Sequence, residues 1–154
     1  ARSWKVETRA GQGGRRMRMT FSLRGDVLWQ DGTPFTARDV KATLLFLKKH
    51  AVPRYFDAVR DIDSVSVSDD RTVVVTMKNV SYWHLHSVGG LPIFPAALLD
   101  RIGDWRSWQP SRNPLPGKTG LTELYGTGPF VFRELKAGDF VRFTRNERFW
   151  LIPR

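Results

Sequence analysis

The feature that most constrains the fold is a pair of short segments in which valines alternate with other residues on either side of a polar turn. Val65 and Val67 precede the polar run 68–71, and Val73 and Val75 follow it. Side chains two residues apart lie on the same face of a strand, so each segment gathers its valines on one face. The pattern therefore predicts a β-hairpin with one buried face.

A second run of the same period lies near the start of the chain. Its apolar residues, which alternate with polar ones, are Met17, Met19, Phe21 and Leu23. This alternation predicts a half-buried strand. Residues 1–8 are expected to form a strand as well. The glycine-rich stretch 11–14 is expected to join the two strands into a hairpin, because glycine tolerates the backbone angles of tight turns.

A turn followed by a capped helix is predicted next along the chain. Asp31-Gly32 is a turn sequence, because glycine permits a positive φ. Thr36 is expected to cap the helix, with Asp39 at the third helical position in the manner of a capping box. The apolar stripe that this helix would pack on a sheet consists of Val40, Leu44 and Leu47. From Pro53 onward we expect a connecting segment.

The rest of the chain predicts short helices, a loop and one more hairpin. The predicted segments are helices over 81–88 and 95–102, a surface loop over 103–125, and a hairpin that pairs 130–135 with 140–144. Gly89-Gly90 is expected to end the first of these helices. Because helices and strands show no regular βαβ alternation, the predicted class is α+β, a mixed or antiparallel sheet with hairpins and a few packed helices.

Composition excludes several classes of protein. The chain has 154 residues, which suits one domain. It has no cysteine, so disulfides, thiolate catalysis and cysteine-based zinc sites are excluded. No apolar run approaches the roughly 18 residues that a membrane span needs, and no signal peptide is visible. We therefore expect any export signal or membrane anchor to lie outside this chain.

The net charge of +10 keeps a second class of function open. Clustered lysines and arginines bind phosphates by releasing counterions, so a basic nucleic-acid-binding module is the alternative function. A solvated basic surface is the simpler interpretation, because acidic residues interrupt the basic run after residue 24. We therefore expect no nucleic-acid partner.

No catalytic or metal site is assembled in the sequence. His84 and His86 are two residues apart, so they would lie on opposite faces of a strand and diverge on a helix. The acidic pair Asp61 and Asp63 lies beside a predicted hairpin, where solvated acids are common. No Gly-x-Ser-x-Gly motif for a nucleophile occurs. We expect neither an enzyme nor a cofactor, and no metal ligands.

Four short motifs occur in order along the chain. They are Ala1-Arg2-Ser3-Trp4, the segment TFSLRGDVLWQDGTPFTARDV at 20–40, Gly126-Thr127-Gly128-Pro129-Phe130, and Arg145-Asn146-Glu147-Arg148-Phe149-Trp150. Together they resemble the motifs of the family-5 extracellular solute-binding proteins, which are the oligopeptide-, dipeptide- and nickel-binding components of ABC importers. One departure is Gly25-Asp26, where the family usually has another residue and then glycine. The resemblance spans the whole chain.

The resemblance implies a fragment of a longer, lobed protein of the periplasmic-binding-protein type II architecture. Residues 1–125 would be the extra domain of the family, and 126–154 a hairpin returning toward the first lobe. The implied function is extracytoplasmic binding of a peptide or similar small solute, by closure of lobes around it. The implied partners are the solute, an ABC transporter permease and the rest of the parent chain. The implied location is periplasmic or at the cell surface.

The resemblance also suggests ligand-facing positions. Tyr55 aligns with an aromatic position that lines the cleft in some relatives, and Val88–Leu91, which includes Gly89 and Gly90, aligns with a segment that reaches the cleft floor. The two glycines would leave room or expose backbone N–H groups. A core or surface aromatic at Tyr55 and a plain helix stop at Gly89-Gly90 are the simpler interpretations, and Trp83 is expected in the core. Structural roles are expected for the motif residues Asp31, Gly32, Thr36, Asp39, Gly126, Gly128, Pro129 and Trp150. The two later glycines would permit a tight crossing, Pro129 would open a strand, and Trp150 would close a core edge.

Overall fold

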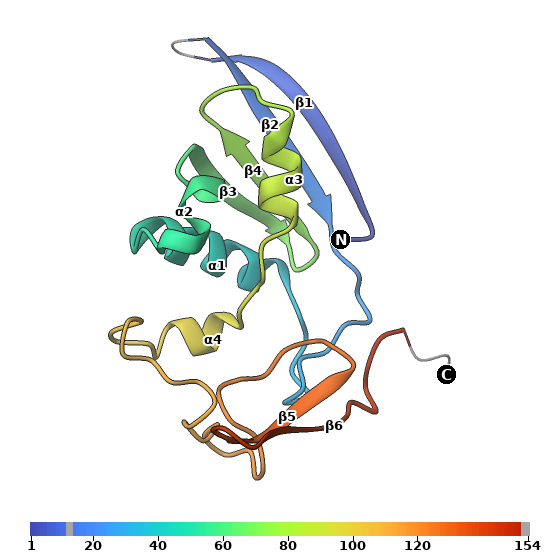
Figure 1. The fold of residues 1–154 in the computed structure, drawn as a ribbon. Coiled ribbons are helices and arrows are strands. Elements are labelled where there is room, and N and C mark those ends of the chain that lie inside the picture. The colour runs from blue at the N-terminus through green and yellow to red at the C-terminus, as the bar shows by residue number, and fades with distance from the viewer. Residues whose placement is uncertain (12–13, 152–154) are drawn as a thin grey trace. The chain divides into compact units, whose positions relative to one another are not determined.

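The computed structural model describes residues 1–11 and 14–151 (Figure 1). Contacts between Cα atoms divide the chain into two compact units. Unit 1 contains residues 1–25 and 36–99, and unit 2 contains residues 26–35 and 100–154. The regular elements of the described chain are antiparallel strands and helices, which confirms the predicted α+β class.

Unit 1 contains an antiparallel sheet of four strands in the order β1-β2-β4-β3 (Figure 1). The strands are β1 (Ser3–Gly11), β2 (Gly14–Ser22), β3 (Ile62–Asp69) and β4 (Thr72–Met77). Val65 pairs with Val75 and Val67 with Val73, so the hairpin predicted from the alternating valines is confirmed. The first hairpin is confirmed as well, since Gly11 pairs with Gly14. The predicted turn between them falls on residues 12 and 13, which lie outside the described residues.

One face of this sheet forms the core of unit 1. Met19 and Phe21 of β2 pair with Val75 and Val73 of β4, and all four side chains are buried. Helix α1 (Ala37–Lys49) contacts β3 and β4, and its predicted apolar stripe is buried. The alternation in the strands and the three- and four-residue spacing in the helix therefore meet in one apolar layer.

Three further helices follow in unit 1, and two of them differ from the prediction. Pro53 does not begin a connecting segment: it begins helix α2 (Pro53–Val59), because a proline at the first helical position lacks only an N–H that would have no helical partner. Helix α3 (Trp83–Gly89) agrees with the predicted 81–88. Helix α4 (Ala96–Leu99) is shorter than the predicted 95–102, because the chain leaves unit 1 after Leu99.

Unit 2 contains the second predicted hairpin. Strands β5 (Phe130–Lys136) and β6 (Phe140–Arg145) pair in antiparallel fashion, which confirms that prediction. Residues 100–125 contain no helix or strand in the described structure, as expected of a long loop. Yet this loop is not wholly superficial, because Leu115 is buried.

The contacts place a boundary at a different point from the predicted one. We expected residues 1–125 to be one domain and 126–154 a returning hairpin, whereas residues 100–125 group with the hairpin in unit 2. One cause is the guanidinium of Arg133 in β5, which donates to the carbonyl of Gly120 at 2.7 Å. Which lobe of a longer protein each unit belongs to stays a prediction.

Within the described residues, none of the helices has the length and apolar character needed to cross a membrane.

Candidate functional site

The two segments expected to face a ligand lie on neighbouring helices of unit 1. Tyr55 belongs to α2 and Val88–Leu91 spans the end of α3, and these helices contact each other. Tyr55 is half-buried, and the guanidinium carbon of Arg54 lies 5.7 Å from the centre of its ring. An aromatic ring and a chain segment far apart in sequence are thus brought to the same part of unit 1.

The end of α3 supports one of the two roles expected for its glycines. Gly89 is exposed, and a Cβ built on it meets no atom within 4 Å, so there is room beside it. The N–H of Gly90 is not free, because it caps the helix by donating to the carbonyl of His86 at 3.0 Å. The N–H of Leu91 donates to Val88 at 3.3 Å. This segment therefore offers a ligand space beside Gly89, whereas the N–H groups of Gly90 and Leu91 already donate hydrogen bonds within the chain.

The other two positions of the segment differ in exposure. The side chain of Val88 is buried and that of Leu91 is half-buried. Val88 is the buried residue of α3, so it anchors the helix on unit 1 and holds Gly89 at the surface.

The aromatic pair at the start of α3 was not predicted to be exposed. Trp83, which we expected in the core, is 67% exposed, and Tyr82 is 86% exposed. Their ring centres lie 5.8 Å apart in an edge-to-face arrangement. The prediction for Trp83 is wrong because this short helix buries Val88 at its far end rather than its first turn. Only the packing of α3 shows which of its residues is buried, so the sequence carried no signal for the exposure of Trp83.

The turn at Asp31-Gly32 has the expected chemistry in unit 2. The carboxylate Oδ1 of Asp31 accepts hydrogen bonds from the backbone N–H and the hydroxyl of Thr33, at 2.8 and 2.6 Å. Gly32 has a φ of +91°, which a side chain would disfavour. Residues 28 and 34 then pair across the turn.

The cap at Thr36 and Asp39 does more than begin α1. Asp39 Oδ2 accepts the backbone N–H of Thr36 at 2.8 Å, as a capping residue should. Its other oxygen, Oδ1, accepts the N–H of Ala96 at 2.8 Å. Asp39 is 7% exposed, so this carboxylate is a buried tie between α1 and the first residue of α4.

The later motifs meet around a buried asparagine that the sequence analysis did not single out. Asn146 donates through Nδ2 to the carbonyl of Gly128 at 2.8 Å, and its backbone N–H donates to the carbonyl of Pro129 at the same distance. Asn146 is buried. The signal for this role was the place of Asn146 in the fourth motif, directly after the strand β6.

The structure also describes the surroundings of the other residues of these motifs. A Cβ built on Gly126 comes no closer than 4.0 Å to its nearest neighbour, and one built on Gly128 meets none within 4 Å, so the described residues show no tight crossing there and that role stays a prediction. Pro129 directly precedes β5, as expected. Trp150 is half-buried and its ring centre lies 5.5 Å from that of Phe149.

The histidines and acids do not gather. Among the described residues, no group of three histidine or acidic side chains could hold a metal ion. The Nε2 atom of His84 lies 2.6 Å from the amide oxygen of Asn79, with which it shares a hydrogen bond.

The comparison with protein families identifies the class. Residues 15–153 match the family described as bacterial extracellular solute-binding proteins, family 5, in its middle region. This match covers nine-tenths of the chain by residue range, so the chain belongs to that family.

Individual relatives carry related names. A Brucella ovis protein named as an ABC transporter peptide-binding protein is 31% identical over 128 residues, which is 82% of this chain and 23% of that protein. The nickel-binding periplasmic protein of Escherichia coli is 27% identical over 136 residues, 85% of this chain and 23% of that protein. The chain thus spans about a quarter of the length of these relatives.

A solved structure shares the fold. NikZ from Campylobacter jejuni, in complex with Ni(L-His), aligns with a TM-score of 0.72 and 27% identity. The alignment covers 95% of this chain and 27% of NikZ.

Proposed function

We propose that this chain is part of a longer extracytoplasmic solute-binding protein that delivers a peptide or similar small solute to an ABC importer. The observation that carries the proposal is the family match over residues 15–153. The relatives are named for peptide and nickel binding, and their names give no support to the alternative, a nucleic-acid-binding module. The partners are the solute, the permease of the importer and the rest of the parent chain.

The mechanism is closure of lobes around the solute, which the importer then recognises. Binding of this kind needs no covalent step and no cofactor, and we propose no enzymatic activity. Within this chain, the ring of Tyr55 on α2 and the space beside Gly89 at the end of α3 are the features that suit a small ligand, because the two helices contact each other.

The hairpin β5–β6 supports a longer parent chain. Its exposed apolar side chains are those of Phe130, Leu135, Val141 and Phe143. A two-stranded hairpin is marginally stable in water by itself, and more strands or a packed layer are needed to cover its apolar face. We propose that the rest of the parent chain covers these side chains.

Because this chain is only part of the proposed parent protein, we also expect its own affinity for the solute to be limited. A micromolar site is worth about 8 kcal/mol, so a chain that supplies half of the contacts would retain about 4 kcal/mol, which is millimolar affinity. We therefore expect this chain alone to bind short peptides weakly. Micromolar binding of a short peptide by these 154 residues alone would contradict the proposed division of the site.

A substitution at Gly89 tests the position of the ligand. Gly89→Leu fills the space beside α3 and replaces a poor helix former by a good one, so it should not destabilise unit 1. The matched control is Gly103→Leu, because Gly103 in unit 2 also has no atom within 4 Å of an added Cβ and no positive φ.

The assay is native mass spectrometry of the exported parent protein, with a library of di- to nonapeptides and Ni(L-His) as probes. Gly89→Leu is expected to weaken retention of the bound probe at least tenfold, whereas Gly103→Leu leaves it unchanged. Equal retention by the two variants would contradict the placement of ligand at α3. Absence of any retained probe from the unaltered parent would contradict solute binding of these classes.

Tyr55 allows an independent test on the same parent protein. Tyr55→Ala is expected to weaken binding about tenfold by removing a ring contact of roughly 1–2 kcal/mol, and Tyr55→Phe should keep most of it. Tyr82→Ala is the control, because Tyr82 lies at the opposite end of α3 from Gly89, about 10 Å away by helical rise. A larger effect at Tyr82 than at Tyr55 would contradict the assignment.

A further inference from the structure

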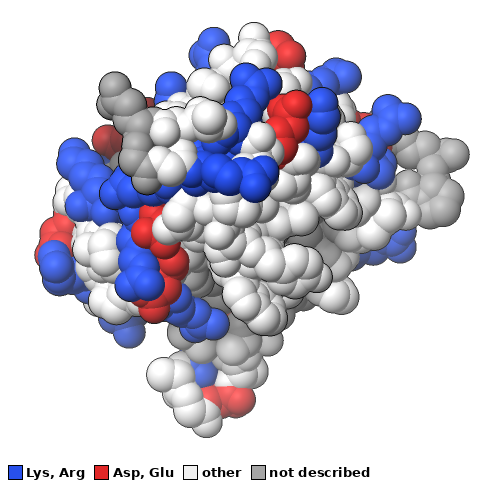
Figure 2. Space-filling model, turned by 90° about the horizontal axis from the view of Figure 1, so that it is seen from above, with Lys and Arg blue, Asp and Glu red and all other residues white. Residues whose placement is uncertain are grey.

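The face of the unit 1 sheet that points away from the core carries a concentration of arginines. Arg16 and Arg18 alternate along β2 with the buried Met17 and Met19, so their side chains leave the opposite face of the strand. Figure 2, a view from above Figure 1, shows lysine and arginine side chains spread over that side of the molecule. The register places Arg9 of β1 directly opposite Arg16.

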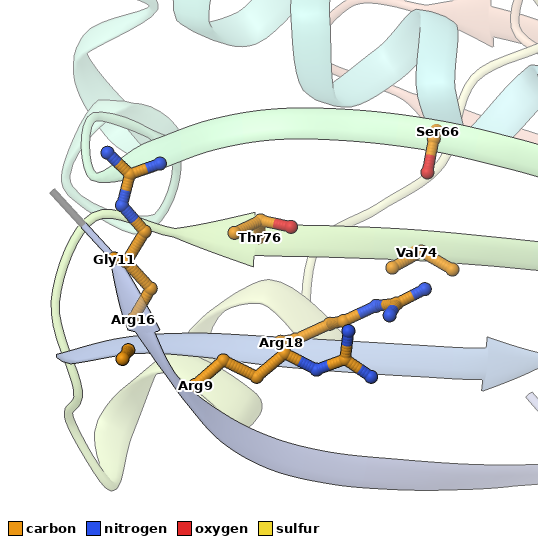
Figure 3. Close-up of a pocket in the computed structure, with 8 residues that line it drawn as sticks. Arg9, Gly11, Arg16, Arg18, Ser66, Val74 and Thr76 are labelled. Carbon is orange, nitrogen blue, oxygen red and sulfur yellow. The ribbon is translucent and has the colours of Figure 1, made fainter.

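A cavity of about 310 Å³ lies among these arginines. The lining residues that can donate hydrogen bonds through their side chains are Arg9, Arg16, Arg18, Ser66 and Thr76. In Figure 3, Arg9 and Arg18 extend in the same direction from β1 and β2, whereas Arg16 extends the other way. A water molecule takes roughly 30 Å³ of liquid volume, so the cavity has room for an oxyanion with a small organic substituent.

The positive charges of this face exceed the nearby negative ones. Glu7 pairs with Lys5 at 3.0 Å and with Arg9 at 3.6 Å, and Asp63 pairs with Arg16 at 2.6 Å. Among the described residues, the side chain of Arg18 forms no ion pair or hydrogen bond, and its charge helps to lower the pKa of Glu7 on the neighbouring strand. Like charges that lie close together on two strands repel, so Arg9 and Arg18, which extend in the same direction from neighbouring strands, favour a bound anion.

Arg16 supplies a second, independent observation. Its Nε atom is buried and has no hydrogen-bond acceptor within residues 1–11 and 14–151. A buried donor without an acceptor is unfavourable. The side chain of Arg16 packs over Gly11, where a Cβ would come within 2.7 Å of the Arg16 Cδ atom. The absence of a side chain at Gly11 therefore allows this position of Arg16.

From these contacts we propose that the cavity is a binding site for a phosphate-type oxyanion. Arg9 and Arg18 bind its oxygens directly, and the hydroxyls of Ser66 and Thr76 are further donors. Guanidinium groups suit this role because their planar N–H forks match the geometry of phosphate and related oxyanions. The phosphate group belongs either to a small soluble phosphate ester or to a phospholipid headgroup. This site is separate from Tyr55 and Gly89, so it does not depend on the proposed transport function.

The test compares two arginines of one hairpin. Arg18→Gln removes a proposed ligand, and Arg15→Gln is the matched control, because Arg15 is adjacent to Arg16 in the strand and so projects from the other face. Both variants change the net charge by the same amount. Inorganic phosphate and glycerol 3-phosphate are titrated into the full chain at fixed ionic strength, with binding followed by amide NMR shifts.

Saturable binding that Arg18→Gln weakens at least tenfold, and that Arg15→Gln leaves within about twofold, supports the proposal. Glu7→Gln is expected to strengthen binding severalfold, because Glu7 competes for Arg9 and lies opposite Arg18.

Vesicles distinguish the two sources of phosphate. Flotation with vesicles of phosphatidylcholine containing phosphatidic acid, lost in Arg18→Gln and not in Arg15→Gln, assigns the site to a headgroup. Binding of glycerol 3-phosphate without flotation assigns it to a soluble ester. Equal weakening by Arg18→Gln and Arg15→Gln, or shifts that do not saturate, would overturn the proposal in favour of diffuse surface charge.

Discussion

Gln30 and Gly126, which are 96 positions apart, are joined by two reciprocal hydrogen bonds. The backbone N–H of Gln30 donates to the carbonyl of Gly126 at 2.9 Å, and the N–H of Gly126 donates to the side-chain oxygen of Gln30 at 3.0 Å. The side-chain nitrogen of Gln30 also donates to the carbonyl of Phe130 at 2.8 Å. Two of the motifs that carry the family resemblance thus meet at one side chain in unit 2.

Gln30→Ala tests this link. The substitution removes a donor and an acceptor from a half-buried site, so we expect the free energy of unfolding to fall by about 1–2 kcal/mol. Urea denaturation followed by tryptophan fluorescence measures the change. Gln30→Glu keeps the acceptor for Gly126 and removes the donor to Phe130. Its free energy of unfolding should therefore lie between those of Gln30→Ala and the unaltered chain. A stability equal to that of the unaltered chain for Gln30→Ala would contradict a structural role for the link.

Asp39 is expected to be among the polar residues that matter most for stability. Asp39→Ala leaves the N–H groups of Thr36 and Ala96 without their acceptor in a buried place, and hydrogen bonds to charged groups are worth roughly 1.5–3 kcal/mol each. We expect a loss of about 3 kcal/mol in urea denaturation. Asp39→Asn keeps one acceptor oxygen and should lose about half as much. If both variants were as stable as the unaltered chain, the two hydrogen bonds would not stabilise unit 1.

Thr43 ties the segment after α3 to α1. Its hydroxyl accepts the N–H of Phe94 at 2.9 Å and donates to the carbonyl of the same residue at 3.2 Å. Thr43→Val has nearly the same volume but removes both of these hydrogen bonds to Phe94, so we expect a loss of about 2 kcal/mol. Thr43→Ser keeps the hydroxyl and should lose less than Thr43→Val. The reverse order, measured by thermal or urea unfolding, would mean that the methyl group matters more than the hydroxyl.

Glu123 gives unit 2 a dependence on pH. Burial raises the pKa of Glu123. Hydrogen bonds from Asn113 and Trp108 and the charge of Arg101 together lower the pKa by more than burial raises it, so the net shift is downward. The side chain is 13% exposed. A carboxylate whose pKa is lower in the folded state stabilises the fold above its usual pKa of 4.5, and this stabilisation is lost as the pH falls through the folded value.

The measurement is the free energy of unfolding as a function of pH in Glu123→Gln and in the unaltered chain. The two curves should differ most at neutral pH and converge below pH 4.5 as Glu123 becomes protonated. Glu134→Gln, at an exposed position of β5, is the control and should leave the curve close to that of the unaltered chain. A gap between the Glu123→Gln curve and the unaltered curve that widens toward acid would contradict the direction of the shift.

The regular elements could be predicted because their patterns are local. Alternation in 65–77 and the spacing of Val40, Leu44 and Leu47 depend only on which face of an element meets the core. The error at Pro53 has the same local origin, since proline both interrupts helices and begins them.

The candidate site could be predicted only in part. The exposure of Trp83 depends on where α3 packs, and the role of Asn146 depends on hydrogen bonds to Gly128 and Pro129. Neither follows from periodicity. The cavity among the arginines escaped the sequence analysis for a related reason: the register, and not the order of residues, places Arg9 opposite Arg16.

The central claim is that the chain is part of a longer solute-binding protein outside the cytoplasm. An immunoblot of fractionated source cells, with antibody raised against these residues, tests it most directly. The account predicts a band several times larger than 17.7 kDa in the exported or membrane-associated fraction. A free 17.7 kDa band in the cytoplasm would contradict it.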